Sequence, residues 1–524
     1  MDPHSNYRLR ILQDLWRIVV LPSLIFSAIV HAENLHLGLL RIPAHFVFLV
    51  FWTIIKRQWT VLLQHREAQR LAAVPIPCVV GKWPGNIDVL LRLMHNFKTS
   101  YILDAYLQLF EEYKCTTLNL RILWIDTIIT MDQEHSRFAL STGFQYFWRG
   151  KMQKERLETF LGQGIFNRDD AQWKMHRAIA RPFFARERIS DFEIFEKHTA
   201  QTLSILSDLS SSNQACEAQD LFSRFSIDAA SEFLFGKNLE TLSASLPIPG
   251  ITKMGPKGSA TEDTWGSFVH AFEMSQQEIT RRARIGYFWP LFEMFNDRNK
   301  VHAKQIQAWL DPLVELALKQ KSTTARFGTS PIVDQTFLQR LADSTDDLVL
   351  IRDQLLSMLL ASRDTTSATL TFITYFMATH PDVAEKMRNE VLSICRVDSP
   401  TYEQMRQMKY VRAVINETLR LFPPVPLNTR ESRTSCVLPT PDKTYPDGKP
   451  LFMPKDTTLT FVSLLTQRNA ALWGDDADEF KPERWLEPDR LGQFVANPTM
   501  YLPFSAGPRI VRSALANPST CLQF

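Results

Sequence analysis

One long helical pattern, from Asp346 to Thr379, constrains the fold of this 524-residue chain more than any other feature. Ser344 or Thr345 can cap its start, and the proline of His380-Pro381 predicts its end. The residues in its middle are apolar on nearly every face: Leu355, Leu356, Met358, Leu359, Leu360, Leu370, Phe372 and Ile373. A helix that is apolar all round must be buried. Strand-like segments are few and short, as at 457–464, so we expect a mainly α-helical (α+β) fold around a long central buried helix, with small β regions.

Polar residues interrupt this helix at its centre, where Arg363, Asp364, Thr365 and Thr366 follow one another. A buried acid beside a hydroxyl costs free energy unless both find partners. Two interpretations stay open at this point. The group is either a hydrogen-bonded polar interruption of a core helix, or a proton-handling site that faces a cofactor or cavity.

The N-terminus carries two apolar runs, from Ile18 to Val30 and from Leu37 to Ile55. The first is short of the roughly 20 residues that span a bilayer. Lys56 and Arg57 follow the second, and basic residues after an apolar run favour the cytosolic side. We expect residues 1–70 to form a membrane anchor with one or two passes and the bulk of the chain in the cytosol. A cleavable signal peptide and a pair of buried core helices are the alternatives.

Residues 71–86 are rich in Pro and Gly and predict a hinge between the anchor and a globular part at 87–510.

Composition narrows the function classes. The net charge of +3 and the absence of a basic stripe argue against nucleic acid as a partner. The six cysteines are scattered with no C-x-x-C, so neither a zinc site nor a disulfide framework is predicted.

Three motifs lie in the C-terminal third. Glu417 and Arg420 share one face of a helix predicted from Tyr410 to Phe422. Such a pair is usually a solvated surface pair, worth a fraction of a kcal/mol. Further on come Pro-Glu-Arg-Trp at 482–485 and Phe-Ser-Ala-Gly-Pro-Arg at 504–509.

With the acid-Thr-Thr of the long helix, these motifs make the chain similar, in order and spacing, to the cytochrome P450 family. A fifth match is Trp173-Lys174-Met175-His176-Arg177 followed by Pro182-Phe183-Phe184, which resembles the W-x-x-x-R helix of that family. The resemblance runs from about Pro75 to Arg509. Residues 164–166 and 426–430 look most like the fungal microsomal alkane and fatty-acid hydroxylases.

The resemblance implies a haem-thiolate monooxygenase that holds haem b and receives NADPH electrons only through a reductase. Its substrate would be lipophilic, and it would sit in the endoplasmic reticulum membrane with the catalytic domain cytosolic. Asp364 and Thr365 would be the catalytic residues that relay protons, while Ser362 stands where the family usually has Gly. The residues implied to bind the cofactor are Trp173, Arg177, Arg430, Phe504, Gly507 and Arg509. The implied structural triad is Glu417, Arg420 and Arg484.

The pattern breaks at the metal ligand. The family motif continues F-x-x-G-x-R-x-C-x-G, but this sequence has Val511 and Ser513 where Cys and Gly are expected. We therefore predict no metal ligand at 511 and interpret 511–524 as an atypical tail, with the C-terminal part of the fold missing. Mis-splicing is the hypothesis for its origin. Cys521 is a remote candidate ligand. The rival hypothesis is a non-catalytic, membrane-tethered pseudoenzyme or relic. A secreted hydrolase is a third possibility, but the sequence lacks the G-x-S-x-G motif typical of such enzymes.

Overall fold

The structure is a computed structural model that describes residues 6–99, 101, 103–181, 192–255, 266–324, 335–396, 399–439 and 448–510. It is mainly helical, as the sequence predicts. The helices are α1 (Tyr7–Leu15), α2 (Leu21–Ala32), α3 (Arg41–Arg70), α4 (Ile87–Thr99), α5 (Asp104–Tyr113), α6 (Gln133–Arg137), α7 (Lys151–Leu161), α8 (Asp170–Ala180), α9 (Phe192–Ser211), α10 (Ala218–Phe235), α11 (Gly266–Ile285), α12 (Lys300–Thr324), α13 (Phe337–Ser344), α14 (Leu348–Thr379), α15 (Pro381–Cys395), α16 (Tyr402–Gln407), α17 (Lys409–Leu421), α18 (Ser463–Thr466), α19 (Ala470–Trp473) and α20 (Pro488–Ala496).

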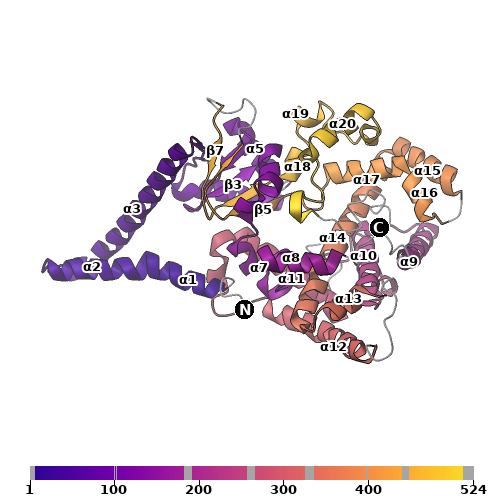
Figure 1. Cartoon of the computed structure of the whole chain (residues 1–524), viewed down its shortest axis with the longest axis horizontal. Coiled ribbons are helices and arrows are strands. Elements are labelled where there is room, and N and C mark those ends of the chain that lie inside the picture. The colour runs from indigo at the N-terminus through magenta and orange to yellow at the C-terminus, as the bar shows by residue number, and fades with distance from the viewer. Residues whose placement is uncertain are drawn as a thin grey trace.

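The strands form two small sheets at one end of the body (Figure 1). The strands are β1 (Val74–Pro75), β2 (Thr117–Asn119), β3 (Thr127–Thr130), β4 (Phe147–Trp148), β5 (Asn428–Ser432), β6 (Cys436–Leu438), β7 (Leu451–Met453) and β8 (Thr458–Phe461). The first sheet has the order β1-β7-β6, with β1 parallel to β7. The second has the order β2-β3-β8-β5-β4, in which only β3 and β8 are parallel. Both sheets therefore join N-terminal strands to strands from the last hundred described residues.

The predicted central helix is α14, which packs against α10, α12, α13, α7 and α17. Its first half is buried in the larger apolar core, where Ile351, Leu355 and Leu359 have no exposed surface. The cap lies two or three residues beyond the predicted Thr345 or Ser344, because the Asp347 side chain accepts the backbone N–H of Leu350 at 3.0 Å. An acceptor at this position satisfies one of the orphan donors of the first turn.

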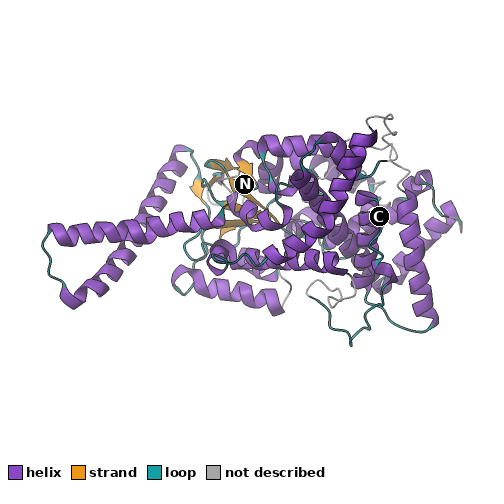
Figure 2. Ribbon diagram, turned by 90° about the horizontal axis from the view of Figure 1, so that it is seen from below, coloured by secondary structure: helices purple, strands orange, loops and turns teal. Residues whose placement is uncertain are grey.

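The two apolar N-terminal runs are longer helices than the sequence pattern suggests. One continuous helix, Tyr7–Ala32, joins α1 and α2 through a π-helical turn (η2, Trp16–Val20), and a second covers Gly38–Arg70. Both are long and apolar enough to cross a membrane, and only 11% and 0% of the residues in their most apolar stretches are buried. They project from the body as two legs joined at their outer ends (Figure 2). This exposure disfavours the alternative of buried core helices.

The segment expected as a hinge is hydrogen-bonded to the body. Val74 and Pro75 pair with β7, and the Val79 N–H donates to the Asn119 carbonyl at 2.9 Å. The predicted strand at 457–464 is shorter, because α18 begins at Ser463. The predictions for Pro182-Phe183-Phe184, Val511, Ser513 and Cys521 concern residues that lie outside the described ranges.

Candidate active site

The E-x-x-R pair lies in the interior rather than on the surface. Glu417, Arg420 and Arg484 are each 1% exposed or less. The Glu417 carboxylate accepts two hydrogen bonds from Arg420, both at 2.8 Å, and one from Arg484 Nε at 2.9 Å. It also accepts hydrogen bonds from Trp485 Nε1 at 2.9 Å and from the Lys481 backbone N–H at 3.0 Å. Five donors on one carboxylate compensate the cost of removing it from water.

Arg420 also fixes the chain that follows α18. Its Nη1 donates to the carbonyls of Gln467 and Ala477, and its Nη2 donates to the carbonyl of Glu479. The Arg420 guanidinium lies over the Trp473 ring, and the distance from its Cζ atom to the ring centroid is 4.9 Å. Residues 467–479, which lead to the P-E-R-W segment, are therefore held against α17 by main-chain contacts.

Gln467 is a structural residue that no sequence motif indicates. Its amide nitrogen donates to the carbonyls of Leu419 and Arg420, and its side-chain oxygen accepts the Leu502 N–H at 2.8 Å. This one buried side chain links the end of the E-x-x-R helix to the loop that carries Phe504. A lone Gln in sequence gives no signal of such a bridge.

A group of buried arginines lies near the end of the described chain. Arg430, on β5, donates to Asn428 Oδ1 and to the Thr429 carbonyl, and its Nε has no hydrogen-bond partner in the described structure. Burial, followed by the charges of Arg149 and Arg509, lowers its pKa well below the ordinary arginine value. Arg149 was not predicted from sequence; it donates to the same Asn428 oxygen at 3.4 Å.

Arg509 is the third member of this arginine group. It donates to Asp169 and, through both terminal nitrogens, to the Arg168 carbonyl at 3.1 Å. Burial and then the charge of Arg149 lower its pKa to about 10, and its Nε also has no partner among the described atoms. Burial opposes ionisation of Asp169, but the charge of Arg509 and the N–H of Arg149 outweigh it and lower the carboxyl pKa.

The W-x-x-x-R helix, α8, brings Trp173 to this group. The guanidinium carbons of Arg509 and Arg177 lie 4.6 and 5.7 Å from the Trp173 ring centroid. Arg177 also donates to the Ile510 carbonyl at 3.0 Å, which ties α8 to the last described residue. Trp173, Arg177 and Arg509, which are far apart in sequence, are therefore brought together.

The F-x-x-G-x-R segment turns tightly. Gly507 has a φ of +65°, and a side chain there would clash with the carbonyl oxygen of Leu140. Glycine is therefore required by the π-helical turn η5 (Phe138–Thr142) against which Gly507 packs. This contact is a reason for glycine that the sequence did not predict. Phe504 is half-buried in the preceding turn.

The acid-alcohol pair lies on α14. Asp364 accepts a hydrogen bond from the neighbouring Arg363 at 3.1 Å, and Arg363 also donates to Glu273 on α11. The Thr365 hydroxyl donates to the Ala361 carbonyl at 2.6 Å, and the Ser362 hydroxyl donates to the Met358 carbonyl at 2.8 Å. Asp364 is paired with a cation inside the protein, which the sequence could not specify.

The geometry suits a large planar anion. Three buried guanidinium groups repel one another, and the Nε atoms of Arg149, Arg430 and Arg509 have no hydrogen-bond partner in the described structure. A buried cation without such partners is costly, whereas a carboxylate would supply acceptors in the fork geometry of arginine. The arginine group can therefore bind carboxylates beside the aromatic face of Trp173.

Comparison with known proteins decides the family. The family model for cytochrome P450 matches residues 85–510. The chain belongs to the cytochrome P450 family. It is 33% identical to cytochrome P450 52E2 of Candida apicola over 451 residues, which cover 85% of this chain and 82% of the relative. It is 35% identical to the cytochrome P450 monooxygenase himC of Aspergillus japonicus, over 75% of this chain and 67% of the relative. Cytochrome P450 52A13 of Debaryomyces hansenii is 32% identical over 81% of this chain.

Membership confirms the predicted family, the mainly helical fold, the monooxygenase class and the haem cofactor. A cytochrome P450 receives its electrons from a redox partner and carries its chemistry on haem iron. The buried arginine group of this cytochrome P450 fits the two propionate carboxylates of haem, because its guanidinium Nε atoms have no acceptor among the described residues. Residue 511, where the family motif would place a Cys ligand, lies outside the described residues.

Proposed function

We propose that this cytochrome P450 inserts one oxygen atom of O2 into a lipophilic substrate, with electrons from an NADPH-dependent reductase. The match to the cytochrome P450 model over residues 85–510 carries the proposal. Long-chain fatty acids and alkanes are the first substrates to test. We place the protein on the endoplasmic reticulum membrane, with the body in the cytosol, on the strength of its two apolar N-terminal helices.

The middle of α14 supports a lipophilic pocket. Met358, Ala361, Ser362, Thr365 and Thr369 are spaced three and four residues apart, so they share one face of the helix. These residues are half-buried, whereas Leu355 and Leu359 on the same central helix are fully buried. A half-buried face that carries Met358 and Ala361 would suit an apolar substrate.

In this proposal each residue has a defined task. Arg430, Arg509 and Arg177 hold the haem carboxylates, and Trp173 packs beside two of these guanidinium groups. Haem, when bound, supplies the activation of O2. Thr365 holds a proton on its hydroxyl, and rotation of that hydroxyl away from the Ala361 carbonyl would present the proton to the pocket.

Val511 favours a second candidate, a non-catalytic scaffold. A thiolate ligand supplies the electron density that favours cleavage of the oxygen–oxygen bond. Valine has no atom that can bind iron, so a chain with Val511 would lack that chemistry even if the arginine group still held haem.

The test compares three full-length chains in membranes with an NADPH-dependent reductase: the printed sequence, Val511→Cys and Val511→Ala. We expect Val511→Cys to give the reduced carbon-monoxide difference spectrum of a thiolate-bound haem and to oxygenate a long-chain fatty acid or alkane. The unsubstituted chain and Val511→Ala should show neither the thiolate spectrum nor oxygenation. That result would identify the unsubstituted chain as a non-catalytic scaffold. A Val511→Cys chain with the thiolate spectrum that oxygenates no lipophilic compound would refute the proposed activity.

A further inference from the structure

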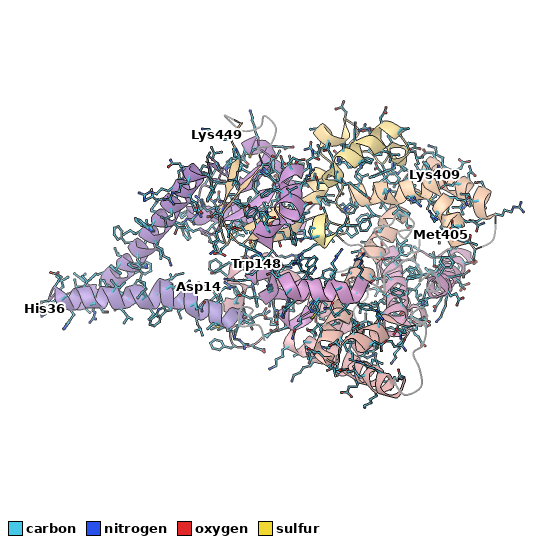
Figure 3. The ribbon with its side chains drawn as sticks, viewed as in Figure 1. Asp14, His36, Trp148, Met405, Lys409 and Lys449 are labelled. Carbon is cyan, nitrogen blue, oxygen red and sulfur yellow. The ribbon has the colours of Figure 1, made fainter. Side chains whose placement is uncertain are left out.

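We propose that the two N-terminal helices enter the lipid bilayer together as a hairpin whose two ends both stay on the side of the catalytic body. The inference rests on the proposed membrane attachment and goes beyond it, because a single membrane pass would put the N-terminus on the opposite side. The hairpin is defined as residues 7–70, with its roots near Tyr7 and Arg57 and its tip at residues 33–40. Figure 3 places His36 at the tip and Asp14 near the body.

The first root is fixed to the body by three contacts. The Tyr7 ring lies 4.6 Å from the Trp289 ring, and its hydroxyl donates to the Glu293 carbonyl. Arg10 Nε donates to both carboxylate oxygens of Glu155, at 3.0 and 2.9 Å.

One turn further along α1, Asp14 accepts the hydroxyl of Tyr287 at 2.6 Å. These body residues belong to α7 and to the 3₁₀ segment after α11, so the start of the first leg must lie on the same side of the membrane as the body. A topology in which only the second helix crosses would separate these partners by the bilayer.

The second root is fixed as well. Arg57 donates to both oxygens of Asp126, at 3.0 and 3.2 Å. Near the end of α3, Ala68 is 1% exposed and packs with Ala73 and Phe452 of the first sheet. Each leg therefore has one end fixed on the body, and the other ends meet at the tip.

The legs contact each other between the roots and the tip. Ser23 Oγ and His45 Nε2 are 2.9 Å apart, which pairs two polar groups that would otherwise face lipid. The Phe26 ring lies 4.9 Å from the His45 ring and 5.3 Å from the Phe48 ring. Polar pairing and aromatic packing are what hold helices together in a bilayer, where no hydrophobic force acts between them.

Charge separates the roots from the tip. Between Ile18 and Ile55, histidines aside, the charged residues are Glu33 and Arg41 alone. The basic residues that flank this stretch lie at the roots: Arg8, Arg10, Arg17, Lys56, Arg57, Arg66 and Arg70. Basic residues mark the cytosolic flank of membrane segments, so both roots are assigned to the cytosolic side of the bilayer.

The length of the legs agrees with joint insertion. Residues 18–32 and 42–55 are each about 22 Å long at 1.5 Å per residue. These stretches are shorter than the roughly 30 Å of a typical hydrocarbon core, but the whole helices, with 26 and 33 residues, are long enough for the hairpin to reach across it.

Exposed aromatic rings mark the membrane surface at both roots. Phe292 and Phe295, next to the Glu293 that holds Tyr7, are 62% and 99% exposed. Trp59 and Trp124, near the Arg57–Asp126 pair, are 59% and 56% exposed. The amphipathic rings of tryptophan are typical of a membrane–water interface, and the exposed phenylalanine rings add apolar surface at the other root.

The test uses the full chain in sealed microsomes with the body facing outward. A membrane-impermeant maleimide is applied to two matched variants at exposed positions, Arg8→Cys at the root and Leu39→Cys at the tip, with the unsubstituted chain as background. We expect Arg8→Cys to react at least tenfold faster than Leu39→Cys until detergent is added. An epitope tag before Met1 should be digested by external protease together with the body.

The outcomes separate the inference from the proposal beneath it. A tag that stays protected while the body is digested, or equal labelling of the two cysteines, overturns the hairpin. A chain that alkaline carbonate washes from the microsomes refutes the membrane attachment itself.

Discussion

Removing the Glu417 carboxylate is the sharpest perturbation of the fold. Glu417→Ala deletes an acceptor of five hydrogen bonds and leaves Arg420 and Arg484, both buried, without their shared counter-ion. Breaking a buried pair by removing one partner costs about 3–5 kcal/mol. Domain stability is only about 5–15 kcal/mol, so this loss is a large fraction of the total.

Arg484→Ala should cost less than Glu417→Ala, because Arg420 still neutralises the Glu417 carboxylate at 2.8 Å. The control is Lys386→Ala, whose ammonium pairs with Glu483 on the exposed surface and should contribute less than about 1 kcal/mol. Chemical denaturation of the detergent-purified chains, followed by tryptophan fluorescence, measures the three values. A Glu417→Ala loss no larger than that of Lys386→Ala would refute the reasoning.

Three further predictions concern stability. Burial and then the charge of Arg168 lower the His176 pKa to about 4. The unfolded chain therefore takes up the proton at a higher pH than the folded chain, and stability falls as the pH drops from about 6.5 to 4. His176→Gln should flatten this dependence of stability on pH, and His36→Gln, at the exposed tip, should leave it unchanged. Gly507→Ala should lower the melting temperature because of its positive φ and its clash, whereas Gly492→Ala, in open space, should not lower it. Gln467→Ala should cost about 1–3 kcal/mol in denaturant titrations, since it leaves three buried main-chain groups without a partner.

The sequence predicts the elements that have strong local signals. The apolar periodicity of α14 and α17 and the proline after α14 placed these helices within about two residues of their bounds. The cap of α14 was missed by two or three residues, because several capping residues follow one another there and only packing selects Asp347.

The site was predictable only where a motif names its residues. Trp173, Arg177, Arg430 and Arg509 came from the resemblance, and geometry adds the reason why they lie together. The sequence analysis missed Arg149, Asp169 and Gln467. Each of these residues acts through a partner hundreds of residues away or through main-chain atoms, and contacts of either kind leave no periodic signal in the sequence.

The docking of the first leg was likewise out of reach of hydropathy. Apolar runs report length and composition, whereas the contacts of Tyr7 and Arg10 depend on how the segment after α11 folds against α7. Topology in the membrane was therefore left open by the sequence as one or two passes.

Haem affinity of two matched arginine variants tests the central claim most directly. Arg430→Gln and Arg433→Gln are made in the Val511→Cys chain; Arg430 is buried, and Arg433 on the same segment pairs with Asp170 at the surface. Spectroscopic titration with haem should show binding at least tenfold weaker for Arg430→Gln, as expected for a lost charged hydrogen bond of about 1.5–3 kcal/mol, and unchanged for Arg433→Gln. Equal affinities of Arg430→Gln and the parent chain would contradict the claim that the buried arginine group holds the haem carboxylates.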